Sequence, residues 1–322
     1  MAFTLTLTAY VEENKADLIM KPITGARTFD YIDVRQGIKS GEKIPIIEST
    51  APAQAGASCG FTSSGTTTIT QTTLNTTSIK VQEALCLQDL EAYFTQKYLP
   101  AGSRPETTTI EADIINRKLA NIAQKVGQMV WQGKTTYTND TYLKQMNGFI
   151  AQIDTAGTAV AATQQASITT STVRGIFEEI IFQKLPLAIS ETGDQVVFCG
   201  IDTYRILMQK LMVDNLYHIL PTAADFKSNE FMYPGSDVKV IGLNELNANN
   251  TTDGGGVLPT VVKNRIIAGS LMNFVAGFDV KADGSDFDVW YSKDNQQLRF
   301  SCRFNIGVVN HWVDQLVQYT NI

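Results

Sequence analysis

Residues 103–133 read SRPETTTIEADIINRKLANIAQKVGQMVWQG and carry the strongest helical pattern of the chain. Ser103 and Glu106 match a capping box with Pro105 in the first turn, and Gly133 supplies a stop signal. Between them, apolar residues recur at spacings of three to five, at Ile110, Ile114, Leu119, Ile122, Val126 and Met129. This pattern predicts a rod of some eight turns, on the order of 40 Å long. A helix of that length is typical of a scaffold rather than of a catalytic element.

An uncharged segment precedes the helix. From Ser49 to Ser78 there is no Lys, Arg, Asp or Glu, and nine of the sixteen residues from Thr62 to Thr77 are threonine. Threonine is β-branched and favours strands, whereas Ala51–Gly60 is rich in turn-type residues. We predict a long two-stranded hairpin with a flexible tip, the alternative being a disordered Thr-rich linker. Because an isolated pair of strands is marginal in water, the hairpin is expected to lie on another surface.

The N-terminus has a strict alternation of apolar and polar residues. Phe3, Leu5 and Leu7 alternate with threonines, as a half-buried strand requires. This strand either pairs within its own domain or extends the sheet of a neighbouring subunit. Short strands are also expected at Asp30–Val34 and Glu42–Ile47.

The middle of the chain alternates strand and helix patterns. The elements expected there are a strand starting at Asn147–Ile150, a helix over Val173–Leu185, a strand at Gln195–Cys199, a helix capped by Asp202 and running through Leu211, and a strand at Val238–Leu243. This order predicts a compact α/β or α+β domain.

Long strands dominate the last third of the chain. They are expected at Asn264–Ala268, Phe274–Lys281, Asp286–Ser292 and Gln297–Asn310. In the last of these, apolar residues alternate strictly with polar ones from Leu298 to Ile306. The turn residues Lys293–Gln296 join the final two strands into a predicted hairpin.

Composition and charge exclude several classes of protein. The 322 residues are 43% hydrophobic, enough for a sizeable core, with a net charge of -6 and a pI near 5.1. No apolar run reaches the roughly 18 residues of a membrane helix, and Met1–Thr8 lacks the features of a signal peptide. No basic patch is visible, which disfavours a dedicated nucleic-acid binder.

The cysteines are far apart without a C-x-x-C pair, so isolated buried thiols in a reducing cytoplasm are expected at Cys59, Cys86, Cys199 and Cys302.

Catalytic motifs are missing from the sequence. There is no phosphate-binding loop, nucleophile elbow or zinc-helix motif, and His218 and His311 favour structural or surface roles over metal binding or base catalysis. The acidic run Asp283–Asp288 is interpreted as a turn rather than a cation site, and Asp253–Gly256 as a surface loop rather than a phosphate site. Glu178 and Glu179 are interpreted as solvent-facing or interfacial charges. We therefore predict no enzyme, and no catalytic, cofactor-binding or metal site.

The order of elements, from strand arm through uncharged hairpin, rod helix and central α/β domain to late long strands, resembles the major capsid protein of tailed bacteriophages. That fold is shared with encapsulin shells and herpesvirus capsid floors. Short apolar segments carry the local likeness, at Ile79–Leu85, Val130–Gly133 with Asn147–Phe149, Gln195–Phe198 with Tyr204–Leu207, Ile266–Ser270, Asp288–Tyr291 with Leu298–Phe300, and Ile306–Val309.

The resemblance implies a fold of class α+β with four parts. These are an N-terminal arm (1–38), an extended β-hairpin loop (39–78), a peripheral domain with a spine helix (79–135 and 273–303) and an axial α/β domain (136–272 and 304–322). The implied function is self-assembly as hexamers and pentamers into an icosahedral shell around a double-stranded DNA genome. The shell would be a virion capsid, assembled in the host bacterial cytoplasm and without membrane contact.

Further partners follow from the same resemblance. Some relatives cross-link covalently through a lysine of the extended loop, but here Lys43 and Lys80 lie only at its base. We therefore expect non-covalent maturation or a decoration protein. Because the chain starts close to the arm, a separate scaffolding protein is expected, together with a portal.

Two other functions remain open from the sequence. One is an encapsulin-type nanocompartment shell with the same fold. The other is a β-rich binding or adhesion module, favoured by the Thr-, Asn- and Gly-rich loops. The helix at Ser103–Gly133 argues against the adhesion module, which has little use for such a rod.

Overall fold

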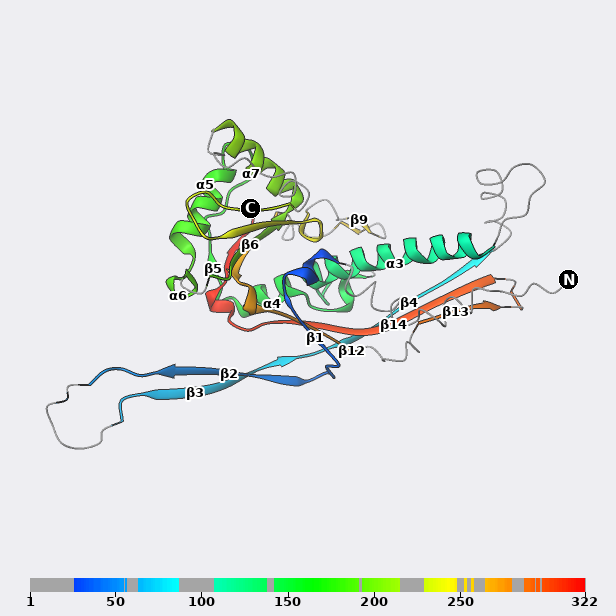
Figure 1. Ribbon diagram of the computed structural model, residues 1–322, viewed down its shortest axis with the longest axis horizontal. Helices are drawn as coiled ribbons and strands as arrows, with labels where there is room; N and C mark the ends of the chain where they lie inside the picture. Colours follow the sequence, from blue (N-terminus) through cyan, green and yellow to red (C-terminus); the bar gives the residue numbers. More distant parts are fainter. Residues whose placement is uncertain are drawn as a thin grey trace.

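The computed structural model describes residues 26–54, 56, 63–86, 107–137, 142–190, 193–214, 229–247, 252–253, 256–257, 264–279, 287–292, 294–295 and 297–321. The predicted strand at Phe3–Thr8 and the capping box at Ser103–Glu106 lie outside these residues. Two main sheets, a long helix and a projecting hairpin make up the described part (Figure 1).

The first sheet is built around the long strand β14 (Gln297–Asn310). One edge of β14 pairs with β4 (Thr77–Cys86), and the other pairs first with β13 (Phe287–Ser292) and then with β12 (Phe274–Asp279), all antiparallel. Strand β1 (Asp33–Gln36) adds to β12 in parallel. The predicted bounds of β14 and its hairpin with β13 are confirmed.

Helix α3 (Thr107–Gln132) covers one face of this sheet, above β4 and β14 in Figure 1. The predicted rod is confirmed, and its 26 residues correspond to roughly 40 Å. Its apolar stripe is buried at Leu119, Ile122, Val126 and Met129, and the side chains of Ile110 and Ile114 lie outside the described part. The N–H of Gly133 donates to the carbonyl of Met129 at 2.9 Å, where the helix ends.

The second sheet is mixed and has six strands. Their order is β5 (Val160–Ala161), β15 (Val317–Tyr319), β11 (Ile266–Ser270), β6 (Gln195–Gly200), β8 (Lys239–Leu243) and β7 (Glu230–Met232). Its helices are α5 (Val173–Glu178), the π-helical turn η3 (Glu179–Lys184), α6 (Leu187–Ser190) and α7 (Ile201–Val213). The predicted helix over Val173–Leu185 therefore continues beyond α5 as a π-helix, in which the N–H of Leu185 donates to the carbonyl of Ile180.

The smaller elements complete the described chain. They are the hairpin strands β2 (Glu42–Thr50) and β3 (Thr66–Leu74), the short pair β9 (Thr252–Asp253) and β10 (Gly256–Val257), helix α4 (Phe149–Ala156), and the 3-10 turns η1 (Arg27–Asp30), η2 (Leu143–Gln145), η4 (Asn244–Leu246), η6 (Leu271–Asn273) and η7 (Val313–Gln315). No helix in the described part combines the length and the apolar character needed to cross a membrane.

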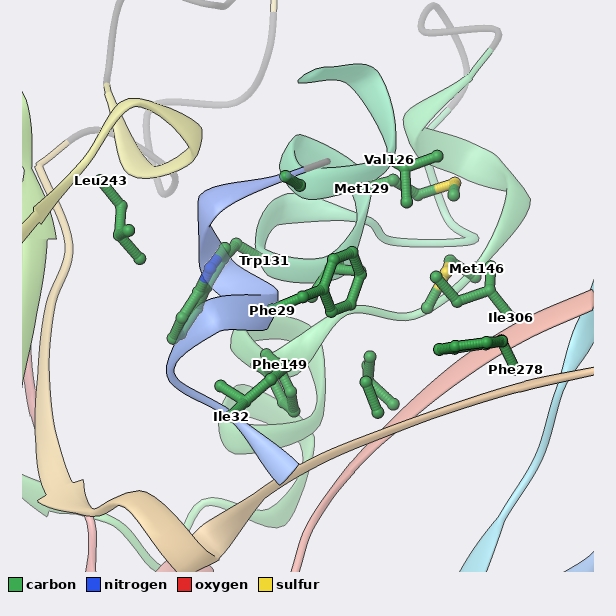
Figure 2. Packing of buried hydrophobic residues seen from close by; sticks show 14 of the residues in the cluster. Phe29, Ile32, Val126, Met129, Trp131, Met146, Phe149, Leu243, Phe278 and Ile306 are labelled. Carbon is green, nitrogen blue, oxygen red and sulfur yellow. The ribbon is translucent and has the colours of Figure 1, made fainter. Parts of the chain in front are cut away.

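A cluster of aromatic rings joins the two sheets. The fully buried Trp131, on the last turn of α3, lies 5.1 Å from Phe149 and Phe198 and 5.7 Å from Phe274, measured between ring centroids. Phe198 belongs to the second sheet and Phe274 to the first. Figure 2 shows how Trp131, Phe149 and Phe29 pack with their aliphatic neighbours in this core.

Three local predictions are wrong. Phe149 starts helix α4 rather than a strand, because Phe149, Ile150 and Ile153 share one buried helical face and Gly157 ends the helix with φ 65°. The segment predicted as a strand at Asp30–Val34 is instead divided between η1 and β1. Helix α7 begins at Ile201 after the N-cap residue Gly200, so Asp202 lies inside the first turn. There its Oδ1 accepts from the N–H of Thr203 at 2.8 Å, and its own N–H donates to Oδ1 of Asn247 at 3.3 Å.

A buried glutamate connects the N-terminal segment to α3. Glu245 in η4 is 5% exposed, and its carboxylate accepts hydrogen bonds from the backbone N–H groups of Arg27 and Thr28, while its Oε2 has no partner. A Cβ at Gly127 of α3 would lie only 2.7 Å from the Cγ of Glu245. Burial raises the pKa of the Glu245 carboxyl above its ordinary value, opposed by these hydrogen bonds and by the nearby charge of Arg27.

This raised pKa predicts a pH dependence of stability. The carboxyl has a higher pKa in the folded than in the unfolded chain, so its ionisation lowers the free energy of unfolding fully at pH values above the folded pKa. This loss shrinks as pH falls and is absent below the ordinary pKa of about 4.3. The free energy of unfolding of the natural protein should therefore rise on acidification relative to Glu245→Gln, which cannot titrate. Urea unfolding at a series of pH values measures this difference. Parallel pH profiles for the two proteins would contradict the prediction.

Candidate assembly surfaces

The hairpin of β2 and β3 projects from the body of the protein (Figure 1). The two strands pair in register from Glu42 with Leu74 to Thr50 with Thr66, over roughly 30 Å. The predicted two-stranded excursion is therefore confirmed, and the linker alternative is wrong for the paired residues. Half of the predicted tip at Ala51–Gly60, namely 55 and 57–60, lies outside the described residues.

The outer half of the hairpin has no core of its own. Ile47 and Ile69 are directly opposite each other in the ladder and are 67% and 64% exposed. Around them the hairpin is held by hydroxyl contacts, including Thr50 Oγ1 with Thr66 Oγ1 at 2.8 Å and Ser49 Oγ with Thr67 Oγ1 at 3.2 Å. An exposed apolar pair on a projecting ribbon with few charges is typical of a surface that another molecule covers.

The root of the hairpin is fixed on the first sheet by two glycines. Gly277 of β12 and Gly307 of β14 are directly opposite each other. A Cβ at Gly277 would lie 2.5 Å from the Cδ2 of the fully buried Leu74, and a Cβ at Gly307 would collide with the backbone carbonyl oxygen of Asn75. The connection after β3 therefore crosses the first sheet at Gly277 and Gly307. No side chain separates the backbone of the connection from the backbone of the sheet there. Leu74 and Ile44 then pack in a small cluster with Ile38, Val275 and Val309.

The histidines do not form a reactive site with other described residues. His218 lies outside the described part. His311 directly follows β14. Its backbone N–H donates to the carbonyl of Asn273 at 3.1 Å, and its imidazole ring contacts Trp312. Its Nδ1 is buried without a partner, and burial, with a smaller effect of Arg35, lowers the pKa of His311. Within the described ranges, no group of three or more His, Cys, Asp or Glu side chains is placed to hold a metal ion.

The acidic candidates have separate surroundings. Glu178 accepts a hydrogen bond from Arg174 at 2.8 Å, whereas Glu179 accepts from the N–H and the hydroxyl of Thr163 at 3.0 and 2.8 Å. They do not form an acid and base pair. In the run 283–288 only Asp288 is described with its side chain, in β13. In 253–256, Asp253 ends β9 and Gly256 begins β10, and the two residues are paired.

The cysteines are distributed over both sheets. Cys199 and Cys302 are buried and Cys86 is half-buried, all as free thiols, and Cys59 lies outside the described residues. Burial, with a smaller effect of Asp202, raises the pKa of the Cys199 thiol, which disfavours the reactive thiolate.

The sequence suggested no basic patch, but the fold forms a cationic cluster. Lys80, Lys118, Lys125 and Arg303, which are far apart in the chain, line one cavity of about 840 Å³ between α3 and β4. Linear charge patterning could not reveal this cluster, because the four side chains come from three separate elements.

Exposed apolar residues also occur on the second sheet and its helices. They are Phe182 in η3, Leu187 in α6, Met212 and Val213 at the end of α7, and Met232 in β7. Phe182 packs its ring against Tyr233, with centroids 6.0 Å apart.

The two glycines at the hairpin root provide a test of its attachment. Gly307→Ala should lower the free energy of unfolding by about 1–3 kcal/mol, because its Cβ meets the backbone of Asn75. Gly277→Ala should cost less, since the end of the Leu74 side chain can shift. Gly175→Ala in α5 is the control: a Cβ there has open space, so stability should be retained or increased. Urea unfolding measures all three, and equal losses for Gly307→Ala and Gly175→Ala would contradict the assignment.

The fold is similar to that of several solved structures. No protein family and no curated protein matches the sequence. A chain of the satellite phage P4 procapsid, solved with the size determination (Sid) protein, is 9% identical, with 98% of this chain and 99% of that chain covered and a TM-score of 0.53. A chain of Mycobacterium phage Ogopogo is 9% identical, with 92% of each chain covered and a TM-score of 0.57. A chain of the capsid of an empty GTA particle is 10% identical, with 92% and 89% covered and a TM-score of 0.54.

These likenesses extend over nearly the whole chain. Because only about one residue in ten is identical, the likenesses show similarity of fold alone. They confirm that the fold resembles the one expected from the sequence. The chain has the α+β fold of phage and GTA capsid structures.

Proposed function

We propose that this protein is a structural, non-enzymatic subunit of an icosahedral capsid shell. The observation that carries the proposal is the combination of a capsid fold over 92–98% of the chain with a projecting hairpin whose outer half exposes an apolar pair. A closed symmetric shell gives each such hairpin a neighbouring subunit to cover it.

The proposed assembly uses two kinds of surface. The hairpin would lie on an adjacent subunit and bury Ile47 and Ile69 there. The exposed apolar side chains of α6 and α7, Leu187 and Val213 among them, would contact other copies around the local symmetry axis. Each Ile or Val side chain buried in this way contributes about 1.5–3 kcal/mol, so a few such contacts per subunit favour association strongly.

The division of the chain is part of the proposal. Residues 1–38 would form the arm, 39–78 the extended loop, 79–135 and 273–303 the peripheral domain, and 136–272 and 304–322 the axial domain. In support, α3 covers the first sheet and α5 to α7 belong with the second. Strand β14 runs unbroken across position 303, so the two domains would share one strand.

Within the capsid class we propose the major capsid protein of a tailed phage. Hexamers and pentamers would enclose double-stranded DNA without sequence-specific contacts, in a virion capsid assembled in the host bacterial cytoplasm. Scaffolding and portal proteins would be partners, with a decoration protein as a further candidate. An encapsulin-type compartment is the competing assignment, and particles carrying protein cargo in place of DNA would favour it.

The exposed pair on the hairpin makes assembly testable. Replacing Ile47 and Ile69 together by Thr retains β-branched side chains but removes apolar area, so the folded subunit should keep its stability. The concentration needed for particle formation should rise roughly tenfold or more. Electron microscopy and sedimentation of the recombinant protein measure this, with the Ile47→Val, Ile69→Val protein as the matched control.

One outcome would contradict the proposed hairpin interface, and another would contradict the shell assignment itself. One is normal particle formation by the threonine variant at the control's threshold concentration, which would remove the hairpin from the interface. The other is a natural protein that stays monomeric at every concentration, with or without a scaffolding protein.

The position of the lysines predicts how mature particles are held together. Lys43 pairs with Thr73 at the base of the hairpin, and Lys80 lies in β4, so no lysine occurs between Ser49 and Ser78. Mature particles should therefore dissociate in SDS into single subunits. A ladder of covalently linked subunits on the gel would refute this expectation.

A further inference from the structure

The cavity between α3 and β4 differs in charge from the rest of the protein. Its lining has the cations Lys80, Lys118, Lys125 and Arg303 and one acid, Glu83, whereas the whole chain has a net charge of -6. Glu83 already forms an ion pair with Lys118. The ammonium of Lys125 lies 4.5 Å from the ring centroid of Tyr142. The residues around this cavity of about 840 Å³ therefore carry an excess of positive charge, which is distributed over both faces of the sheet. Lys80 and Arg303 alternate with residues such as Cys302 and Phe304 that are buried against α3, so their side chains project from the face turned away from α3.

Two of these cations repel each other. Lys80 and Arg303 are directly opposite in the β4–β14 ladder, and both are exposed. Neither forms an ion pair with another described residue. Like charges directly opposite in a sheet are destabilising. A bound anion between them would offset that repulsion.

The cavity also reaches an open strand edge. In the described part of the chain, β4 pairs only with β14. Four consecutive residues of β4, 78–81, line the cavity. Every second residue of such a strand turns its N–H and C=O away from its partner, and these groups form a template for an added strand.

The floor of the cavity is apolar. Ile122 and Val126 of α3 face it from one side, and Phe300 and Phe304 of β14 from the other. An extended peptide placed on β4 would direct alternate side chains toward this floor. The phosphate backbone of a nucleic acid would use the cations, but it has no backbone donors and acceptors spaced to pair with β4. The combined features therefore favour a polypeptide ligand.

We propose that this cavity binds an acidic segment of another protein as an added strand along β4. Carboxylates of the segment would lie against Lys80 and Arg303 on the sheet face turned away from α3. The alternate, apolar side chains of the segment would pack toward Val126 and Phe300 on the α3 face. The site extends beyond shell assembly, since it assigns the chain a surface for a partner of different composition.

A designed peptide tests the proposal on the purified full chain. The probe alternates Glu and Val over roughly five residues, enough to cover residues 78–81 of β4 without reaching Ala84, the partner of Arg299, and carries a fluorescent label. Anisotropy should show saturable binding that weakens with salt, because exposed charges are screened. The same peptide with Lys in place of Glu should not bind. Methylation of alternate backbone nitrogens should weaken binding roughly tenfold or more, because it removes the main-chain donors.

Variants connect binding to the cavity. The double substitution Lys80→Gln with Arg303→Gln should weaken peptide binding about tenfold or more. Arg299→Gln is the matched control, because Arg299 is on the same strand but does not line the cavity. Since the double substitution removes a like-charge pair, its urea unfolding should show no loss of stability. Its particle formation should match that of the natural protein, so loss of peptide binding alone separates this site from shell assembly.

Three results would overturn the proposal. One is the absence of saturable binding by the acidic peptide. Another is an equal loss of affinity in Arg299→Gln and in the double variant. The third is a single-stranded DNA oligonucleotide that displaces the peptide and binds more tightly, which would make the cavity a nucleic-acid site.

Discussion

The indole of Trp131 occupies the place where the chain's separate parts meet. Its ring contacts Phe198 of the second sheet and Phe274 of the first, and its N–H donates to the hydroxyl of Thr28 at 2.8 Å. A buried tryptophan requires a partner for its N–H, so the segment entering η1 must return to the end of α3. This one side chain therefore fixes the helix, both sheets and the start of the described chain relative to one another.

Much of the scaffold follows from regular patterns in the sequence. The alternation from Leu298 to Ile306 predicts the first part of β14, because a strand with one buried face leaves a period of two. The stripe ending at Met129 and the stop at Gly133 likewise predict the end of α3. Long elements with one buried face repeat their pattern many times, and that repetition makes them readable.

Features that depend on contacts between distant segments could not be predicted in this way. Gly277 and Gly307 are 30 residues apart, and only their pairing in the sheet reveals the crossing of the hairpin root. The cationic cavity combines β4, α3 and β14, so the candidate site emerges only from the fold. For α4 the signal was present: Phe149, Ile150 and Ile153 have helical spacing, but the preceding Asn-Gly suggested a turn into a strand.

The distribution of the hydrophobic core supports the proposed association of subunits. Both sheets bury apolar side chains on at least one face, whereas the hairpin buries only Ile44, Ile46 and Leu74, all in its inner half. Beyond that point the strands are joined by main-chain pairing and threonine hydroxyls, which contribute little net stability in water. Ile47 and Ile69 gain their burial free energy only when another surface covers them. The described chain is thus a stable body carrying a ribbon whose outer half lacks a core, which is the physical basis of the proposed contact with a neighbour.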